Sequence, residues 1–518
     1  PRWLAEQYPE ILKVDKDGRR VLPGERVIFC PTSEVYRSSI SRFNSALAER
    51  YAGHPALAIW HVSNEYCGGI RNQCHCDLCK VAFQGWLRRR YGSIDTLNWE
   101  WWTRFWSNTY NDFDEINPPL TYANVGAIQG QMLDWNRFCT YQMVDFFKTE
   151  AAPLRELAPE IPITTNIMGM YEGLDYTKFA DVMDVISWDS YPEPNGDPSY
   201  TAFCHSLMRG LKNNNPWILM EQTPSSTNWH GYHRLKPPGL MRAISWAAMG
   251  HGSDGAMYFQ WRRCLGGQEK MHGAVVAHAG HENTRVFQEV SKLGGEMDTL
   301  SAEVVGTRVT TARVGLLWSQ ENRWALNGSC GPSKDKGVIE TATNHFRSVW
   351  KLKVPIDIVR MDGDWSQYDI LIAPTMYMVK SGTFPLEGTP EEMHGRIDEA
   401  AKLKEWVSAG GTLVTTHLTG YVNESDHIYH GGYPGPLREL LGIWSEEIDN
   451  HPIGEATNAI VLDGDLKLPQ GEYTCDHFFD MIHSEGAEVV ATYGSNWYAG
   501  QPVVTRNTFG EGTAWYIA

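Results

Sequence analysis

The sequence predicts an α/β protein that consists of an incomplete (β/α)8 TIM barrel followed by a second α/β domain. Three observations support this fold class. Short β-rich runs alternate with helix-like segments up to about residue 262, polar loop residues follow each run, and the alternation restarts after residue 305. Strands that alternate with helices in this way are typical of parallel sheets covered by helices. We therefore expect two domains, at residues 1–305 and 306–518.

Five parallel strands are expected in the first domain. They are Ala56–Ser63, Ile163–Ile167, Val185–Trp188, Trp217–Met220 and Ala256–Phe259, and the segment Arg26–Phe29 is expected to end an earlier strand. Only 55 residues precede Ala56. Three strand–helix units of roughly 30 residues each need more chain than this, so about two barrel strands are expected to be missing from a truncated chain.

The second domain is expected to contain sequential βαβ units. Its predicted strands are Val314–Trp318, Pro355–Val359, Asp369–Pro374, Gly411–Thr416 and Thr513–Ile517. This order is typical of a doubly wound sheet. No glycine-rich phosphate loop follows its strands, and no cysteine stands at a nucleophile elbow. A role in assembly is therefore favoured over a second active site.

Composition narrows the range of partners. The chain carries 62 acidic and 45 basic residues, a formal charge of −17, and no run rich in lysine and arginine, which argues against nucleic acid as a partner. No stretch reaches the ~18 consecutive apolar residues that cross a bilayer, and the mean hydropathy is −0.38. The cysteine pattern favours a cytoplasmic location, although the start at Pro1 leaves export open.

Two glutamates follow apolar runs at predicted strand ends, namely Glu65 and Glu221. In a (β/α)8 barrel, the carboxyl ends of the strands carry the catalytic residues. Hydrolysis of a glycosidic bond needs one carboxylic acid to protonate the leaving oxygen and a second carboxylate to attack or to activate water. The pair therefore indicates a glycosidase, and the alternative is that one or both glutamates are ion-paired residues at the rim of the barrel.

The neighbours of each glutamate suggest different roles. Asn64 precedes Glu65, and the aromatic side chains of Trp60 and Tyr66 are expected to surround it. Such an apolar environment favours the protonated form, as a general acid/base requires. Tyr191 follows the preceding predicted strand and is expected to donate to Glu221. A hydrogen bond of this kind favours the ionised form, as a nucleophile requires.

A cluster of cysteines follows Glu65, within a predicted metal-binding loop at residues 67–79. Close thiolate spacing suits tetrahedral Zn²⁺, so Cys30, Cys74, Cys76 and Cys79 are expected to hold a structural zinc ion. His75 and Cys67 are reserve ligands. The alternatives are buried thiols without a ligand and, less compatibly with the tight spacing, disulfides.

Several motifs together resemble glycoside hydrolase family 42 β-galactosidases. They are Asn64-Glu65-Tyr66, the Cys74-x-Cys76-x-x-Cys79 run, Arg26 before Cys30-Pro31-Thr32-Ser33, Trp188-Asp189-Ser190-Tyr191-Pro192, and Phe259-Gln260-Trp261-Arg262 with Glu269-Lys270-x-His272. The resemblance extends over essentially the whole chain. The 21 tryptophans agree with sugar binding, since indole faces are amphipathic contact surfaces.

The resemblance implies a retaining exo-β-galactosidase that releases terminal β-D-galactose, with Glu65 as acid/base and Glu221 as nucleophile. The implied substrate-binding residues are Arg26, Asn64, Tyr191, Trp229, Phe259, Glu269 and His272. The four cysteines match the zinc ligands of the family, and no organic cofactor is implied. The second domain resembles the flavodoxin/amidotransferase-like trimerisation domain of the family, which implies a homotrimer.

Two other functions stay open at this point. An α-L-arabinopyranosidase would use the same residues, because its substrate differs from a β-galactoside chiefly in lacking the hydroxymethyl group. A non-catalytic sugar-binding or assembly protein would be expected to lose one of the two carboxylates, and both are present.

Overall fold

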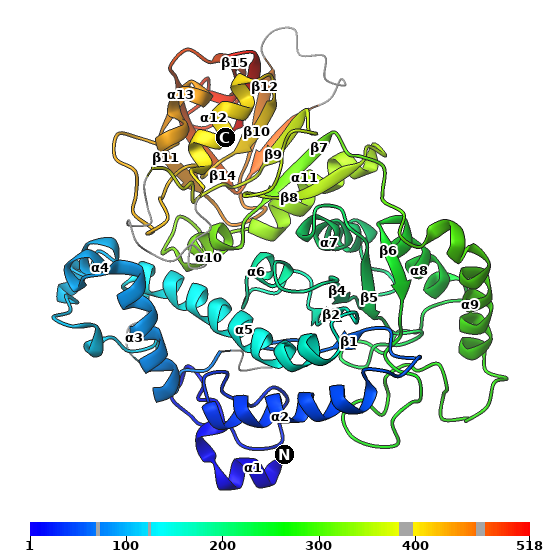
Figure 1. The fold of residues 1–518 in the computed structure, drawn as a ribbon. Coiled ribbons are helices and arrows are strands. Elements are labelled where there is room, and N and C mark those ends of the chain that lie inside the picture. Colours follow the sequence, from blue (N-terminus) through cyan, green and yellow to red (C-terminus); the bar gives the residue numbers. More distant parts are fainter. Residues whose placement is uncertain (69–72, 123–125, 383–396, 463–471) are drawn as a thin grey trace.

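The computed structural model describes residues 1–68, 73–122, 126–382, 397–462 and 472–518. Four residues of the predicted zinc loop, 69–72, lie outside this range. In Figure 1 the chain forms two parts, with the first running from blue to green and the second from yellow-green to red. Both parts combine helices and strands, so the α/β fold class that the sequence predicts is confirmed.

The first part alternates helices with short parallel strands. Its helices are α1 (Arg2–Gln7), α2 (Glu34–Tyr51), α3 (Asp77–Tyr91), α4 (Ile94–Glu100), α5 (Gln129–Leu157), α6 (Tyr176–Ala180), α7 (Pro198–Leu211), α8 (Leu240–Gly250) and α9 (Arg285–Val304), with 3-10 turns at Pro9–Ile11, Phe105–Ser107 and Phe113–Glu115. Its strands are β1 (Trp60–His61), β2 (Ile163–Thr164), β3 (Asn166–Ile167), β4 (Ser187–Asp189), β5 (Trp217–Glu221) and β6 (Ser253–Ala256).

These strands form an open arc of parallel pairs among the described residues. β1 pairs with β2, and β3 to β6 pair in sequence order. β2 and β3 are two halves of one predicted strand, separated by Thr165. Because the strands are parallel, their carboxyl ends lie at one edge of the arc.

Three strand predictions of the first part need correction. Only Trp60–His61 of the predicted strand Ala56–Ser63 is a strand, because a turn precedes it, in which the Leu57 N–H donates to the His54 carbonyl. Arg26–Phe29 is not a strand, since only Phe29 forms an isolated antiparallel bridge, with Leu12. β6 ends at Ala256, where the predicted strand begins, because the strand uses the small and polar residues Ser253–Ala256 rather than the apolar run after them. The bend after β6 then directs Phe259 back toward Gln222, whose carbonyl accepts from its backbone N–H at 2.9 Å.

The long helix α5 supports the arc from outside. Its 29 residues present an apolar stripe that includes the fully buried Phe146 and Phe147, and α2 packs along it. The core behind the strands also contains Phe203 and Trp217, both fully buried. Large side chains on each side of short strands hold the strand ends in place.

The second part is built on one nine-stranded sheet in the order β13-β12-β15-β16-β17-β10-β9-β7-β8. Its strands are β7 (Val314–Trp318), β8 (Ile356–Arg360), β9 (Ile370–Ala373), β10 (Thr412–Thr416), β12 (Thr457–Leu462), β13 (Tyr473–Asp476), β15 (Glu488–Tyr493), β16 (Pro502–Phe509) and β17 (Gly512–Ile517), while β11 (Ile443–Asn450) and β14 (Phe478–Ser484) form a separate pair. Its helices are α10 (Gln320–Gly328), α11 (Val338–Lys351), α12 (Glu399–Ser408) and α13 (Arg438–Leu441), with a 3-10 turn at Gly435–Leu437.

The five strands predicted for the second part are all present, within one residue at nearly every end. β8, β7, β9, β10 and β17 are parallel neighbours, which is the flavodoxin-like order. The sequence does not predict the antiparallel strands β11 to β16, which lie between β10 and β17 along the chain. The boundary predicted at residues 305 and 306 falls between α9 and β7 and stays a prediction.

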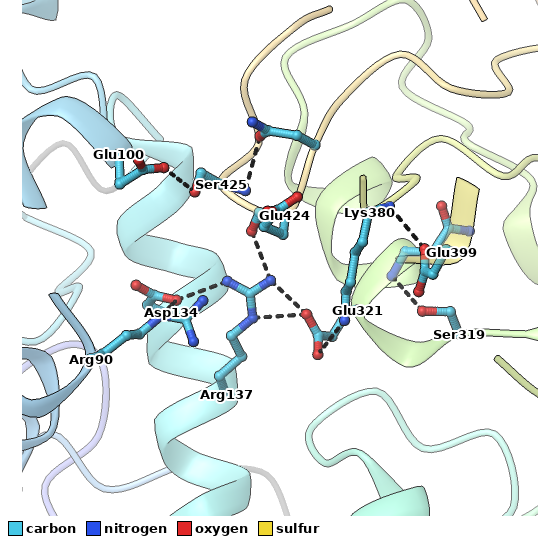
Figure 2. Close-up of polar contacts among 12 residues, drawn as sticks. Arg90, Glu100, Asp134, Arg137, Ser319, Glu321, Lys380, Glu399, Glu424 and Ser425 are labelled. Carbon is cyan, nitrogen blue, oxygen red and sulfur yellow. Dashed lines mark hydrogen bonds and ion pairs between the residues drawn. The ribbon is translucent and has the colours of Figure 1, made fainter. Parts of the chain in front are cut away.

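A buried ionic network joins the two parts. Arg137 on α5 donates to Asp134 at 2.9 Å, to Glu321 on α10 at 2.9 Å, and to the backbone carbonyl of Glu424 at 2.8 Å. Lys380 pairs with the other carboxylate oxygen of Glu321 at 3.2 Å. Figure 2 shows Arg137 between the carboxylates of the two parts. Because these charges are removed from water, each depends on its partners.

No helix among the described residues is long and apolar enough to cross a membrane.

Candidate active site

Four polar residues meet at the carboxyl edge of the parallel arc. Glu65 follows β1, Asn166 opens β3, Asp189 ends β4 and Glu221 ends β5. One oxygen from each of the three carboxyl groups lies within 4.8 Å of the others. The two glutamates singled out in the sequence, 156 residues apart, are therefore neighbours across a short gap.

Glu65 sits in a tight turn with strained backbone. Its φ is 44°, in the left-handed region that non-glycine residues rarely adopt. Three residues on, a Cβ at Gly68 would lie 2.7 Å from the carbonyl oxygen of Glu65, so only glycine fits there. Residues held in such conformations concentrate at functional sites.

The environment of Glu65 differs from the one expected. Arg26 forms an ion pair with Glu65, whereas Tyr66 turns to the opposite side, is 3% exposed and donates to the buried carboxyl group of Glu150. The tight turn at Glu65 directs the two side chains to opposite sides, so Tyr66 packs in the core while Glu65 faces the site. The prediction that Tyr66 surrounds Glu65 is therefore wrong.

Glu221 receives a short hydrogen bond from Tyr191, whose hydroxyl group donates to Oε2 at 2.5 Å. Burial raises the pKa of Glu221 above its usual range, while the Tyr191 hydroxyl opposes the shift; the Glu65 charge raises this pKa as well, and Arg26 lowers it. The Tyr191 hydroxyl therefore favours the ionised form of Glu221.

Asp189 adds a third carboxyl group that the sequence analysis did not assign to the site. It is 8% exposed, and burial, followed by the charges of Glu221 and Glu65, raises its pKa well above its ordinary value. Repulsion from the charges of Glu221 and Glu65 thus adds to burial in favouring the protonated form of Asp189.

Asn166 is the other residue that the sequence analysis missed. It is 1% exposed, donates to Asp189 at 2.5 Å and to Asn64 at 3.0 Å, and accepts from the backbone N–H of Glu65 at 3.1 Å. The signal that would have found it is its position, since it is a polar residue near the end of a predicted buried strand.

An aromatic wall lies beside Glu221. Trp229, half exposed, stacks on His272 with ring centroids 4.7 Å apart, and Tyr191 contacts both rings. Phe259 packs against His272 at 5.1 Å. His272 is fully buried, and its two ring nitrogens face Asn228 at 2.9 Å and the Phe259 carbonyl at 3.0 Å. His272 therefore supports the wall rather than offering a free polar atom.

Glu269 and Asn64 complete the predicted set. The charge of Glu269 contributes to the raised pKa of Glu221. Asn64 is exposed, and its side-chain oxygen accepts from Asn166. The structure thus brings Arg26, Asn64 and Tyr191 to the carboxylate cluster, with the aromatic wall next to it.

The four predicted cysteine ligands form a separate buried cluster. All four sulfurs lie within 4.8 Å of one another, and Cys30 lies 3.5 Å from both Cys76 and Cys79. No disulfide joins the described cysteines. Sulfurs 2.3 Å from a tetrahedral Zn²⁺ would be about 3.8 Å apart, so the donor set and its spacing fit a metal ion. Cys67 is not part of the cluster, and the His75 ring packs against Trp135.

Comparisons with known proteins cover both parts of the chain. A family model described as β-galactosidase (glycoside hydrolase family 42) matches residues 1–300, and one described as β-galactosidase trimerisation domain matches residues 312–386 and 392–518. β-Galactosidase BgaP of Planococcus sp. (strain L4) is 47% identical over 524 residues, which cover 100% of this chain and 74% of that protein. β-Galactosidase Pbg of Clostridium perfringens is 44% identical over 529 residues, which cover 100% of this chain and 73% of that protein.

Solved structures give the same result. The crystal structure of β-galactosidase from Bacillus circulans sp. alkalophilus superposes with a TM-score of 0.93 at 44% identity, covering 100% of this chain and 74% of that one. A β-galactosidase from Rahnella sp. R3 follows with a TM-score of 0.92 at 41% identity. The arc of strands and the flavodoxin-like sheet are thus shared with these proteins.

Proposed function

The chain belongs to the glycoside hydrolase family 42 β-galactosidases, and we propose that it removes terminal β-D-galactose from galactosides with retention of configuration. Glu65 acts as acid/base and Glu221 as nucleophile. The observation that carries this assignment is the approach of their carboxylate oxygens to within 4.8 Å. Retaining glycosidases place their two carboxyl groups ~5–5.5 Å apart, whereas inverting enzymes need ~6.5–9.5 Å to admit a water molecule between them.

The first chemical step forms a galactosyl ester. Glu221 attacks the anomeric carbon while Glu65 gives its proton to the departing glycosidic oxygen, so that one C–O bond forms as the other breaks. Tyr191 holds Glu221 ionised before the attack. In the second step Glu65 takes a proton from water, whose oxygen displaces Glu221 and completes galactose.

Arg26 connects sugar binding to Glu65. Its guanidinium group pairs with the Glu65 carboxylate, and the hydroxyl groups of galactose are alternative acceptors for the same guanidinium group.

Three of the remaining predicted residues bind the sugar, and two support them. Asn64 and Glu269 offer polar atoms to its hydroxyl groups, and Trp229 offers a half-exposed indole face to its C–H groups. Phe259 and His272 hold the wall behind this indole.

The test compares Glu221→Ala and Glu65→Ala variants of the full-length protein. Glu221→Ala is expected to abolish turnover of aryl β-galactosides. Glu65→Ala is expected to retain turnover of a substrate with an acidic leaving group and to yield β-galactosyl azide when azide is added. Survival of turnover in Glu221→Ala, or α-galactosyl azide as the product, would contradict the mechanism.

The cysteine cluster holds a structural Zn²⁺. Four thiolates leave no open coordination position, so the ion braces the loop after Glu65 and takes no part in the chemistry. Removal of the metal with a chelator is expected to lower the thermal midpoint, with zinc release detected by a colorimetric dye in a ratio of one per chain. An unchanged midpoint after complete metal removal would exclude the structural role.

The second part mediates assembly into a homotrimer. Its match to the trimerisation-domain model supports this assignment, and light scattering of the purified protein tests it by the molar mass. The cytoplasmic location stays a prediction from the cysteine pattern.

A further inference from the structure

Asn166 contacts both proposed catalytic glutamates as well as the groups between them. Its Oδ1 accepts from the backbone N–H of Glu65 at 3.1 Å and lies 2.9 Å from His61 Nε2. Its Nδ2 lies 2.5 Å from Asp189 Oδ2, 3.0 Å from Asn64 Oδ1 and 3.4 Å from Glu221 Oε1. The residue is 1% exposed, so water does not compete for these bonds.

The orientation of this amide group is fixed by its neighbours. The backbone N–H of Glu65 can only donate, so the atom of Asn166 that faces it is the oxygen. The amide nitrogen then faces three acceptors with two hydrogens. The shorter distances assign these hydrogens to Asp189 and Asn64, and Glu221 lies next to the same nitrogen.

The oxygen of Asn166 restrains a backbone that needs restraint. Glu65 has a φ of 44°, and such a conformation persists only when surrounding contacts hold it. The position of the Glu65 carboxyl group follows from this backbone. A shift here moves the acid relative to the glycosidic oxygen that it protonates.

The nitrogen of Asn166 restrains the third carboxyl group. Asp189 is only 8% exposed, and its Oδ2 accepts from the Asn166 amide at 2.5 Å. Burial and the charges of Glu221 and Glu65 favour its protonated form. Arg26, Tyr191 and Glu269 also affect the pKa of Glu221, and the ring of His61 lies 2.9 Å from Asn166 Oδ1.

We infer that Asn166 is a positioning residue for both catalytic carboxylates: its oxygen fixes the backbone that carries Glu65, and its amide nitrogen holds Asp189 beside Glu221. This inference rests on the proposed function. It assigns two separable tasks to the two ends of one amide group.

Two substitutions separate these tasks. Asn166→Ala removes both ends of the amide group. Asn166→Asp keeps an oxygen for the Glu65 N–H but replaces the donor with a further carboxyl oxygen. A matched control is Asn458→Ala in the second part, because Asn458 is 2% exposed and likewise bridges backbone groups, at Ser495 and Gly494.

The readout is the dependence on leaving group, measured with phenyl and 4-nitrophenyl β-D-galactoside. A poor leaving group needs the acid more, so a misplaced Glu65 slows phenyl galactoside more than 4-nitrophenyl galactoside. For Asn166→Ala we expect kcat/KM to fall roughly 100-fold on the phenyl substrate and the ratio between the two substrates to change about tenfold. For Asn166→Asp we expect an equal loss on both substrates and an acidic limb of kcat/KM that moves to higher pH, because a further carboxyl group disfavours ionisation of Glu221.

Two results would overturn the inference. One is Asn166→Ala with kcat/KM within about threefold of the unchanged protein on both substrates. The other is a loss of kcat/KM in Asn166→Ala that is equal on the two substrates and that Asn458→Ala also shows. Such a shared loss marks a purely structural effect. If Glu221→Ala is inactive while Asn166→Ala is unaffected, this inference alone fails; turnover in Glu221→Ala would remove the proposed function as well.

Discussion

The hydrogen bond from Tyr191 to Glu221 predicts how the enzyme depends on pH. The hydroxyl group donates to the carboxylate at 2.5 Å, and it opposes the rise in the pKa of Glu221 that burial causes. Tyr191→Phe removes this donor and keeps the ring against Trp229. The pKa of Glu221 then rises further, so a smaller fraction of the enzyme carries an ionised nucleophile at low pH.

The expected size follows from the bond that is lost. A hydrogen bond to a charged group contributes ~1.5–3 kcal/mol. At 1.4 kcal/mol per factor of ten, kcat/KM on the acidic side of the profile should fall roughly 10–100-fold. At higher pH Glu221 ionises without help, and the loss should shrink.

The assay is the pH profile of kcat/KM with an aryl β-galactoside. Tyr429→Phe is the control, because Tyr429 lies in the second part and its hydroxyl donates to the carbonyl of Val379 at 2.7 Å. We expect the acidic limb to move to higher pH in Tyr191→Phe and to stay in place in Tyr429→Phe. An acidic limb that stays in place in Tyr191→Phe, or a loss of equal size at every pH, would contradict this role of the Tyr191 hydroxyl.

Two further predictions concern buried charges. Arg137→Met removes one ion-pair partner from each of Asp134 and Glu321, so we expect the free energy of unfolding to fall by about 3–5 kcal/mol. The denaturant midpoint should be lower than in the exposed control Arg2→Met. Equal midpoints in the two variants would contradict this prediction. Burial raises the pKa of Glu150 to about 7 from 4.5, so its protonated form favours the fold below pH 4.5 and this stability is lost as the pH rises through 7. Glu150→Gln should therefore match the unchanged protein at pH 4.5 and exceed it by up to about 3 kcal/mol at pH 8, and a difference independent of pH would exclude this origin.

The strand ends could be predicted because each follows a short apolar run. Glu65 and Glu221 were found in this way, and the parallel arrangement then brings them together. The sequence does not identify Asn166 as a site residue. It predicts one strand where the structure has β2 and β3, and this places Asn166 within the strand rather than at the site. Asp189 was seen at a strand end, but sequence alone does not reveal how deeply a carboxyl group is buried.

Side-chain direction explains the other differences. The sequence places Tyr66 next to Glu65, yet the turn directs the two side chains to opposite faces. The pairing of Arg26 with Glu65 joins segments 39 residues apart, and no local pattern encodes it.

In the second part, the parallel strands have apolar runs that stand out, whereas the antiparallel β11 to β13 carry many polar residues and are not predicted from the sequence.

The central claim is that Glu221 forms the covalent bond to galactose. The most direct measurement is to treat the full-length protein with an activated 2-deoxy-2-fluoro-β-D-galactoside, whose ester turns over slowly, and to locate the label by mass spectrometry of the digested protein. We expect inactivation with one label per chain, on Glu221. A label on Glu65 or Asp189, or no label on an enzyme that turns over aryl galactosides, would contradict it.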